Sequence, residues 1–366
     1  MDFADKRAVV TGAASGIGRA IAAELAARGA RVLLADIDSV RLEEAVAAIG
    51  AGASWQLCDV SDHAQVEALA ATASERLGGC DFAFANAGVI TSGRMTRMSP
   101  TEVDWILGVN VRGTWSTATV FARMMQDQTE GGHIVLTGSE HSLGLQHAGA
   151  AIYTASKHAV LGLAEVLRAE APENLSVSLF CPGLVGTALG SGPRPEGLAA
   201  SPPQSEAGRM IQARGMSAEE AARRALDGVA AGEFYIVTHP HSLRAAEQRF
   251  HEIEGAFARQ APWFEGAEKV GRQFGDGRSH RRAQKPPELE ETNRAIHPSG
   301  PHRPDRFAVV PGLHELRRCR AAATPGSCLK RTAARSSAPR WNPGSTSSTR
   351  PTNMPAARPR RLPGGH

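Results

Sequence analysis

The sequence predicts an α/β fold, in which a doubly wound (Rossmann-type) sheet of seven parallel strands carries helices on both faces. Short apolar runs alternate with longer segments of helical periodicity along the first 260 or so residues. The short runs are apolar throughout rather than alternately polar and apolar, as expected for strands covered on both faces. Glycine-rich and polar motifs directly follow these runs, at the strand ends where open α/β sheets bind ligands.

Four of the predicted strands lie in the first half of this region. The run RAVVT is the first, and the helix after it ends at Gly29, a residue type common at helix C-caps. Apolar runs predict three more strands, and amphipathic alanine-rich segments predict the helices between them. The strands cover 7–11, 31–36, 54–60 and 81–88, and the helices cover 17–28, 40–49 and 64–77.

Two serine caps mark helices in the second half. The sequence SPTE at 99–102 is a capping box with proline at the first helical position, and it predicts one long helix to about residue 126. Ser217 and Glu220 cap another helix. The other elements are strands at 133–139, 176–183 and 233–240, a helix at about 153–170, a Pro-, Gly- and Ser-rich loop at 188–216, and a final helix to about residue 259.

The turn after the first strand has the sequence TGAASGIG. Its glycines allow a tight turn and a close approach of the backbone to a pyrophosphate at the helix N-terminus. The spacing G-x-x-x-G-x-G differs from the common dinucleotide pattern, so a generic glycine-rich turn is the alternative for this motif alone. The residues predicted to hold the cofactor here are Gly12, Ser15, Gly16, Ile17 and Gly18.

Asp36 ends the second strand, 18 residues after Gly18. A carboxylate there accepts hydrogen bonds from both hydroxyls of an adenosine ribose and repels a 2′-phosphate. Ala14, Ser15 and Ile37 supply no cation for such a phosphate. NAD is therefore the expected cofactor and NADP is disfavoured, with a solvated turn residue as the alternative for Asp36.

Two further strand ends extend the predicted nucleotide site. Asp59 and Val60 end the third strand, where an acceptor could meet the adenine amine. Asn86, Ala87 and Gly88 end the fourth, where small residues let a cofactor pass close to the backbone. Each motif alone is also compatible with an ordinary strand end.

Tyr153 and Lys157 stand one helical turn apart in the segment AIYTASKHAVLGLAEVL. Residues four apart share a helix face, so the ammonium group can lie beneath the phenol and lower its pKa from about 10 towards a working pH. Tyr153 is therefore a candidate proton donor and acceptor. For this spacing alone, a solvated surface pair is the alternative.

Taken together, these motifs resemble the single-domain short-chain dehydrogenase/reductase (SDR) family. The resemblance covers about residues 3–260 in order, with one mild departure where Ala85 stands in place of a usual asparagine. It rests on the glycine turn, Asp36, 59–60, 85–88, Asn110 in GVNVRGTW, Ser139 in IVLTGS, the Tyr153/Lys157 pair and PGLVGT at 182–187.

The resemblance implies hydride transfer between NAD and a secondary alcohol or ketone. Tyr153 would exchange a proton with the substrate oxygen, and Lys157 would lower the pKa of Tyr153 and bind the nicotinamide ribose. Ser139 would hold the substrate oxygen, and Asn110 would fix a water that links Lys157 to solvent; the alternatives are a plain strand end and a polar helix interruption. The residues implied to contact the nicotinamide carboxamide are Pro182, Gly183, Val185 and Thr187.

Substrate and partners follow from the same resemblance. The loop at 188–216 is where the family keeps a mobile lid, and Glu140 and His141 border the expected pocket. His141 is either a hydrogen-bond partner of the substrate or a partly solvated loop histidine. A homodimer or homotetramer is expected through helices 103–126 and 153–170. A catalytically silent NAD-binding regulatory or scaffold protein on the same fold is the alternative function.

The chain divides into two parts of opposite charge. Residues 1–265, the predicted dehydrogenase domain, carry 21 Lys and Arg against 30 Asp and Glu, whereas residues 266–366 carry 20 against 7. The rear part also holds 13 of the 22 prolines and lacks apolar periodicity, so we interpret it as a disordered tail, for which an altered reading frame is one origin. A nucleic-acid-binding tail is the alternative, which the lack of interleaved aromatic residues disfavours.

Cysteine and hydropathy bear on the location of the protein. An odd number of cysteines without a signal peptide predicts a reducing compartment, and no apolar run reaches the roughly 20 residues that span a bilayer. The expected location is the cytoplasm, without a membrane partner. No metal is predicted, because no metal-ligand spacing relates Cys58, Cys80, Cys181, Cys319 and Cys328.

Overall fold

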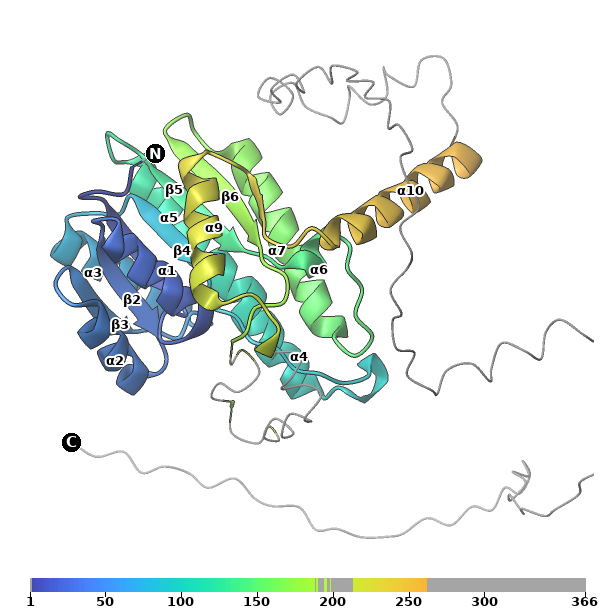
Figure 1. Ribbon diagram of the computed structural model, residues 1–366, viewed down its shortest axis with the longest axis horizontal. Helices are drawn as coiled ribbons and strands as arrows, with labels where there is room; N and C mark the ends of the chain where they lie inside the picture. Colours follow the sequence, from blue (N-terminus) through green and yellow to red (C-terminus); the bar gives the residue numbers. More distant parts are fainter. Residues whose placement is uncertain (1, 188, 190–193, 196–197, 199–212, 262–366) are drawn as a thin grey trace, which may run out of the picture. The chain divides into compact units, whose positions relative to one another are not determined.

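The computed structural model describes residues 2–187, 189, 194–195, 198 and 213–261. These residues form one sheet of seven parallel strands in the order β3-β2-β1-β4-β5-β6-β7, which confirms the predicted fold class (Figure 1). The strands are β1 (Arg7–Thr11), β2 (Arg31–Asp36), β3 (Ala53–Leu57), β4 (Phe82–Ala85), β5 (Gly132–Thr137), β6 (Leu175–Cys181) and β7 (Tyr235–Val237).

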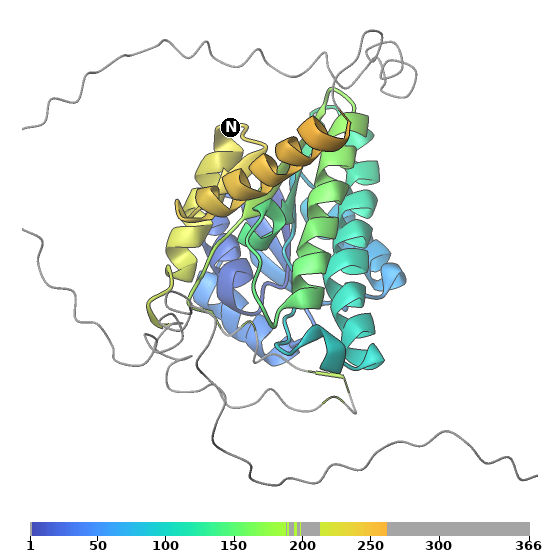
Figure 2. The same ribbon diagram turned by 90° about the vertical axis from the view of Figure 1, so that its right-hand side faces the viewer.

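Helices cover both faces of the sheet (Figures 1 and 2). Helices α1, α2 and α9 contribute to the core on one face, and α3, α5 and α7 to the core on the other. The bounds are α1 (Gly16–Ala27), α2 (Ser39–Ile49), α3 (His63–Leu77), η1 (Met95–Arg97), α4 (Pro100–Leu107), η2 (Gly108–Gly113), α5 (Thr114–Gln126), α6 (Glu140–Leu143), α7 (Ala151–Glu170), α9 (Ala218–Ala230) and α10 (Ser242–Gln260).

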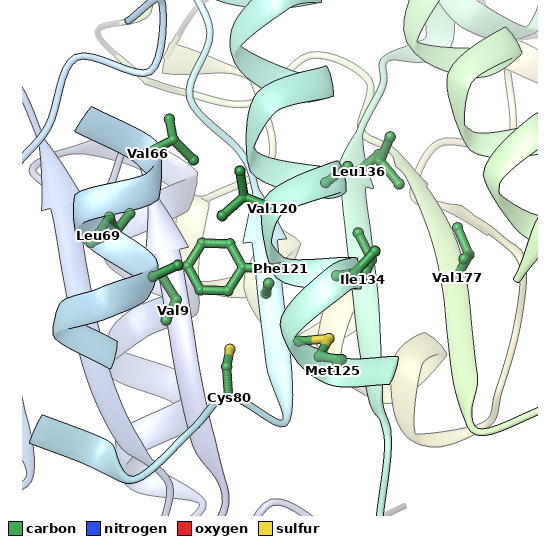
Figure 3. Packing of buried hydrophobic residues seen from close by; sticks show 14 of the residues in the cluster. Val9, Val66, Leu69, Cys80, Val120, Phe121, Met125, Ile134, Leu136 and Val177 are labelled. Carbon is green, nitrogen blue, oxygen red and sulfur yellow. The ribbon is translucent and has the colours of Figure 1, made fainter. Parts of the chain in front are cut away.

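The core explains why apolar residues follow one another in the strands. Val9 and Val10 are neighbours in β1, yet Val9 is buried beneath α3 and α5 whereas Val10 is buried on the opposite face. Figure 3 shows Phe121 of α5 packed between Val9 and the sheet residue Ile134, with Leu69 of α3 beside it. Burial of both faces favours apolar residues at consecutive strand positions, which is the pattern in most of β1, β2 and β4.

The predicted long helix over residues 100–126 is wrong in one respect, because it is divided. The capping box forms as expected at Ser99 and Glu102, but the α-helix ends at Leu107 and a π-helical segment, η2, leads into α5. Asn110 lies in η2 and is fully buried. Such π-bulges are frequent at functional sites, and they reposition side chains relative to a regular helix.

Other strand and helix boundaries differ by a few residues. Strands β3 and β4 end at Leu57 and Ala85, so the predicted cofactor motifs at 59–60 and 86–88 lie in the loops just beyond them. The short helix α6 is an element that the sequence analysis did not predict. It places Glu140 and His141 in a helix rather than in a loop.

Some predictions fall outside the described residues. The tail at 266–366 lies wholly outside them, as does most of the predicted lid at 188–216. The ends of the lid segment are described, and Val185 and Met216 form a parallel bridge that holds these ends side by side. Within the described parts of the chain, no helix is both long enough and apolar enough to cross a membrane.

Candidate active site

The ends of β1 and β4 are joined by side-chain hydrogen bonds. Thr11 Oγ1 accepts from the backbone N–H of Asn86 at 3.1 Å and of Ala87 at 3.2 Å. Asn86 Nδ2 donates in return to the backbone oxygen of Thr11 at 3.0 Å. These bonds hold the 86–88 segment against the glycine turn, so two of the predicted cofactor motifs form one surface.

The glycines of the turn are required by close packing. A Cβ on Gly18 would lie 2.2 Å from the backbone oxygen of Gly12, and a Cβ on Gly12 would lie 2.7 Å from Ala87 Cα. Gly12 and Gly16 also have φ angles of 67° and 55°, where side chains are strained. Ser15 is the N-cap of α1, but its side chain makes no capping bond. The turn therefore offers a hydroxyl and first-turn N–H groups to an anion.

Asp36 faces the glycine turn. Its Oδ2 accepts from Ala14 N at 3.1 Å and its Oδ1 from Ile37 N at 2.7 Å. Burial raises the pKa of the Asp36 carboxyl above its usual value. Its effect exceeds the opposite effect of the three backbone N–H groups that donate to this carboxyl. Three backbone N–H groups occupy three of the about four lone-pair positions of this half-buried carboxylate, so Oδ2 keeps one for a ribose hydroxyl, and Asp36 is not the solvated turn residue of the alternative.

The two residues of the motif at 59–60 have different roles. Asp59 Oδ1 accepts from the backbone N–H of Ser61 at 2.9 Å, which shapes the loop after β3. Val60 is buried, and a Cβ on Gly113 would lie 2.6 Å from its Cγ2. Val60 thus packs against the π-helical segment and couples the expected adenine side of the site to the element that carries Asn110.

Ser139, Tyr153 and Lys157 lie together beyond the ends of β5 and β6. Ser139 is the N-cap of α6, and its side chain hydrogen-bonds that of Tyr153 in the first turn of α7. Lys157 Nζ lies 5.7 Å from the centre of the Tyr153 ring and donates to the Thr137 backbone oxygen at 2.8 Å. A Cβ on Gly88 would lie 3.6 Å from Lys157 Nζ, so this pair also borders the 86–88 segment.

The net pKa shift of Tyr153 is opposite to the expected one. Burial raises the pKa of the phenol to about 12, and the hydrogen bond from Ser139 offsets only part of this effect. Burial also lowers the pKa of Lys157 to about 8. The expectation was wrong because it counted the attraction between phenolate and ammonium and left out the cost of removing both groups from water.

Asn110 is held by three hydrogen bonds. Its Oδ1 accepts from Val89 N at 2.8 Å, and its Nδ2 donates to Val89 O at 2.9 Å and to Ser156 Oγ at 3.0 Å. The alternative in which Asn110 bonds its own backbone is therefore not what the structure has. Instead, its side chain fastens the loop after β4 to Ser156 of α7, the residue directly before Lys157.

The 182–187 segment runs from α6 towards the glycine turn. Pro182 O accepts from Glu140 N at 2.9 Å, and Gly183 N donates to Thr238 Oγ1 at 3.1 Å. At the other end, a Cβ on Gly16 would lie 3.2 Å from Cβ of Thr187. The segment therefore spans the distance between the catalytic candidates and the expected pyrophosphate site.

Several residues support this arrangement in roles that the sequence did not indicate, and one of them, Glu140, was expected only to border the substrate pocket. Thr11 and Thr137 end strands and hold the neighbouring motifs, and Ser156 accepts from Asn110. Glu140 fastens the start of α10 to α6, since its Oε2 accepts from Ser242 Oγ at 2.8 Å and lies 3.0 Å from His241 Nε2. Only Ser156 had a signal in the sequence, because it shares a helix face with Tyr153.

Comparison with protein families identifies one match over more than half of the chain. The family model described as "short chain dehydrogenase" matches residues 6–196. Two relatives from Streptomyces share the name 1-deoxy-11-beta-hydroxypentalenate dehydrogenase. The protein from S. avermitilis is 36% identical over 271 residues, which cover 72% of this chain and 96% of that protein. The protein from S. arenae is 33% identical, with 68% and 87% covered.

A solved structure agrees with these relatives. A short-chain dehydrogenase/reductase from Burkholderia phymatum, in complex with NAD, is 36% identical and superposes with a TM-score of 0.65. The match covers 72% of this chain and 98% of that one. The similarity in sequence and in fold therefore extends over nearly the whole length of these proteins.

Proposed function

Because the chain belongs to the short-chain dehydrogenase/reductase family, we propose that this oxidoreductase transfers a hydride between NAD and a secondary alcohol or ketone. The observation that carries the proposal is the meeting of Ser139, Tyr153 and Lys157 at the carboxyl edge of the sheet, beside Gly88. All three side chains are buried; Ser139 is the N-cap of α6, and Tyr153 and Lys157 lie on α7. A bound nicotinamide dinucleotide supplies the carbon that accepts or donates the hydride.

The chain's own residues align the substrate and move its proton. The Ser139 hydroxyl holds the substrate oxygen against the Tyr153 oxygen, which takes the proton as a phenolate during alcohol oxidation and returns it as a phenol during ketone reduction. In the free enzyme the hydrogen bond from Ser139 lowers the pKa of Tyr153, whereas with substrate bound the one hydroxyl proton of Ser139 goes to the substrate oxygen. Lys157 stabilises the phenolate that oxidation requires while its ammonium is charged, which its pKa of about 8 allows at neutral pH. In this role Asn110 holds α7 and the 86–88 loop in register, in addition to the proposed water relay.

Asp36 is the basis for proposing NAD rather than NADP. Its carboxylate, flanked by uncharged residues on the glycine turn, favours a ribose diol over a ribose phosphate. The Burkholderia relative was solved with NAD, which supports the same choice. Replacing Asp36 by Ala should weaken NAD binding and narrow the preference for NAD over NADP, measured as the ratio of the two dissociation constants.

The names of the relatives indicate which substrates to test first. The Streptomyces proteins are named for a hydroxypentalenate, so we propose terpenoid alcohols as the first compounds to test, followed by steroid, sugar-derived and aryl alcohols. The experiment follows NADH absorbance while each alcohol is added to enzyme and NAD. Steady NADH formation with at least one secondary alcohol is expected. A screen in which NAD binds but no alcohol is oxidised would favour the second candidate, a silent NAD-binding regulatory or scaffold protein.

We also propose that the protein forms a homodimer or homotetramer through α5 and α7. Each of these helices exposes one large apolar side chain, Trp115 on α5 and Val166 on α7. The two helices lie side by side on one face of the sheet (Figure 2). Sedimentation of the wild type against Trp115→Asp tests this assembly, because a charge at a buried interface dissociates it.

A further inference from the structure

Helix α6 places His141 against Tyr153, the proposed proton donor, although the proposed reaction gives His141 no role. The residue lies in α6, two positions after Ser139, and its side chain is buried. Its ring meets the Tyr153 ring edge-to-face at 5.3 Å, with an angle of 83° between the planes. A group bound at this imidazole would therefore lie next to a substrate whose oxygen is held by Ser139 and Tyr153.

One nitrogen of His141 is committed and the other is available. Nδ1 lies 2.7 Å from Thr154 Oγ1, a contact in which either group can donate, depending on the tautomer of the imidazole. An anion at Nε2 selects the tautomer that carries its proton on Nε2, in which Thr154 Oγ1 donates to Nδ1. Within the described parts of the chain no side chain or backbone group hydrogen-bonds Nε2, and it is not among the atoms closed off from solvent without a partner. His141 therefore presents one N–H donor.

The groups around His141 favour an anion. Lys157 and His158 of α7 and His147 of the preceding segment all act to lower the pKa of His141, together with burial, which has the largest effect. The His147 ring lies 6.3 Å from the His141 ring. Glu140 is the one acidic neighbour that acts in the opposite sense, and its Oε2 is already bonded to Ser242. Three basic side chains therefore surround His141 against one carboxylate, and that carboxylate already accepts a hydrogen bond from Ser242.

We propose that His141 is a specificity-determining residue that binds a carboxylate on the substrate. The inference rests on the proposed function and adds a substrate class to it, namely small hydroxy acids and oxo acids whose carboxylate stands a short carbon chain or one ring away from the reacting carbon. Nε2–H donates to the carboxylate, and the His147 ring lies 6.3 Å from that of His141. A bound anion also favours the protonated imidazole, and hydrogen bonds between charged groups are stronger than those between neutral ones.

The test compares an acid with its ester. The probes are 3-hydroxycyclohexane-1-carboxylate and its methyl ester, which share the ring and the secondary alcohol and differ in charge. The wild type should oxidise the acid with a kcat/KM about 10- to 100-fold higher than that for the ester, the range of a hydrogen bond to a charged group. The variant His141→Phe keeps an aromatic edge against Tyr153 and removes the donor. In this variant, kcat/KM for the acid should fall most of the way to the value for the ester, while kcat/KM for the ester should stay unchanged.

Two further variants separate recognition from structure. His141→Gln retains a side-chain N–H and should restore part of the preference for the acid. His251→Leu, at an exposed position of α10, is the matched control and should leave the preference unchanged. Equal rates with acid and ester in the wild type, or an equal loss of both in His141→Phe, would overturn the proposal.

A binding measurement tests recognition of the carboxylate independently of hydride transfer. The same two probes are titrated calorimetrically into the wild type and the variants in the presence of NAD. If neither probe is oxidised but the acid binds more tightly than the ester and His141→Phe abolishes the difference, the carboxylate site stands while the hydride-transfer role of Tyr153 comes into question. Absence of any difference in binding would remove the carboxylate site whatever the rates are.

Discussion

Close contacts at single residues determine what the nucleotide site tolerates. Gly18→Ala would place a Cβ 2.2 Å from the Gly12 backbone oxygen and 2.5 Å from Asn86 Nδ2, so the glycine turn or the 86–88 loop must move. We expect a loss of about 1–3 kcal/mol in the free energy of unfolding and weaker NAD binding, measured by denaturant unfolding and calorimetry.

A glycine elsewhere in the domain provides the control. Gly162 in α7 is exposed, and a Cβ there would meet nothing within 4 Å. Gly162→Ala should stabilise the fold by about 0.5–1 kcal/mol, because alanine is the better helix former. Unchanged NAD binding in Gly18→Ala would contradict the role of this turn as the pyrophosphate site.

His133 makes stability depend on pH. Ser178 Oγ donates to Glu233 O, so it accepts from His133 Nε2, while the buried Nδ1 has no partner. Burial lowers the pKa of His133 to about 4 from 6.5. Between these values the unfolded chain binds a proton that the folded chain does not, so stability is lost as the pH falls from 6.5 to 4, by about 1.4 kcal/mol per pH unit from this group.

The measurement is denaturant unfolding of wild type and His133→Gln at several pH values within this window. The variant should lose less stability on acidification, although it is less stable at pH 7. Parallel curves for the two proteins would show that His133 is not the source. Other histidines, including His141, contribute the same slope to both proteins and cancel in the comparison.

At the scale of elements, the π-helical segment η2 is stabilised by contacts at Asn110. Asn110→Ala would remove the partners of the Val89 N–H and C=O groups and of Ser156 Oγ. We expect destabilisation by about 3 kcal/mol, because buried polar groups lose their hydrogen bonds. Thr119→Ala removes a hydroxyl that bonds only backbone oxygens of its own helix, α5, and should change stability by less than about 0.5 kcal/mol. Similar losses in the two variants would mean that Asn110 does not hold η2 in place.

Elements with local signals were predicted well. Strand β1 coincides with the predicted apolar run, and helix α9 begins after the predicted serine cap. Both signals depend only on residues that are neighbours in the sequence. The π-helical turn was missed because the hydrogen bond that holds its Asn110, to Val89, joins residues 21 positions apart in the sequence. Likewise, the residues of the candidate site were identified by motif, but the direction of the Tyr153 pKa shift depends on burial by α6 and α7, which spacing alone does not reveal.

At the scale of the whole molecule, the domain boundary near residue 265 is a prediction. The described helix α10 ends at Gln260, and the acidic part of the chain ends close by. A chain that ends at residue 265 should unfold at the same temperature as the full chain and bind NAD with the same affinity. A loss of either would show that residues 266–366 belong to the working protein.

The central claim is that Tyr153 transfers the substrate proton while it contributes little to cofactor binding. The most direct measurement is Tyr153→Phe, assayed for turnover with the best alcohol and, in parallel, for NAD affinity by calorimetry. We expect turnover to fall by at least about 100-fold, the lower range of proton-transfer catalysis, with the dissociation constant for NAD nearly unchanged. Turnover that survives the change, or NAD binding that is lost together with it, would contradict this account.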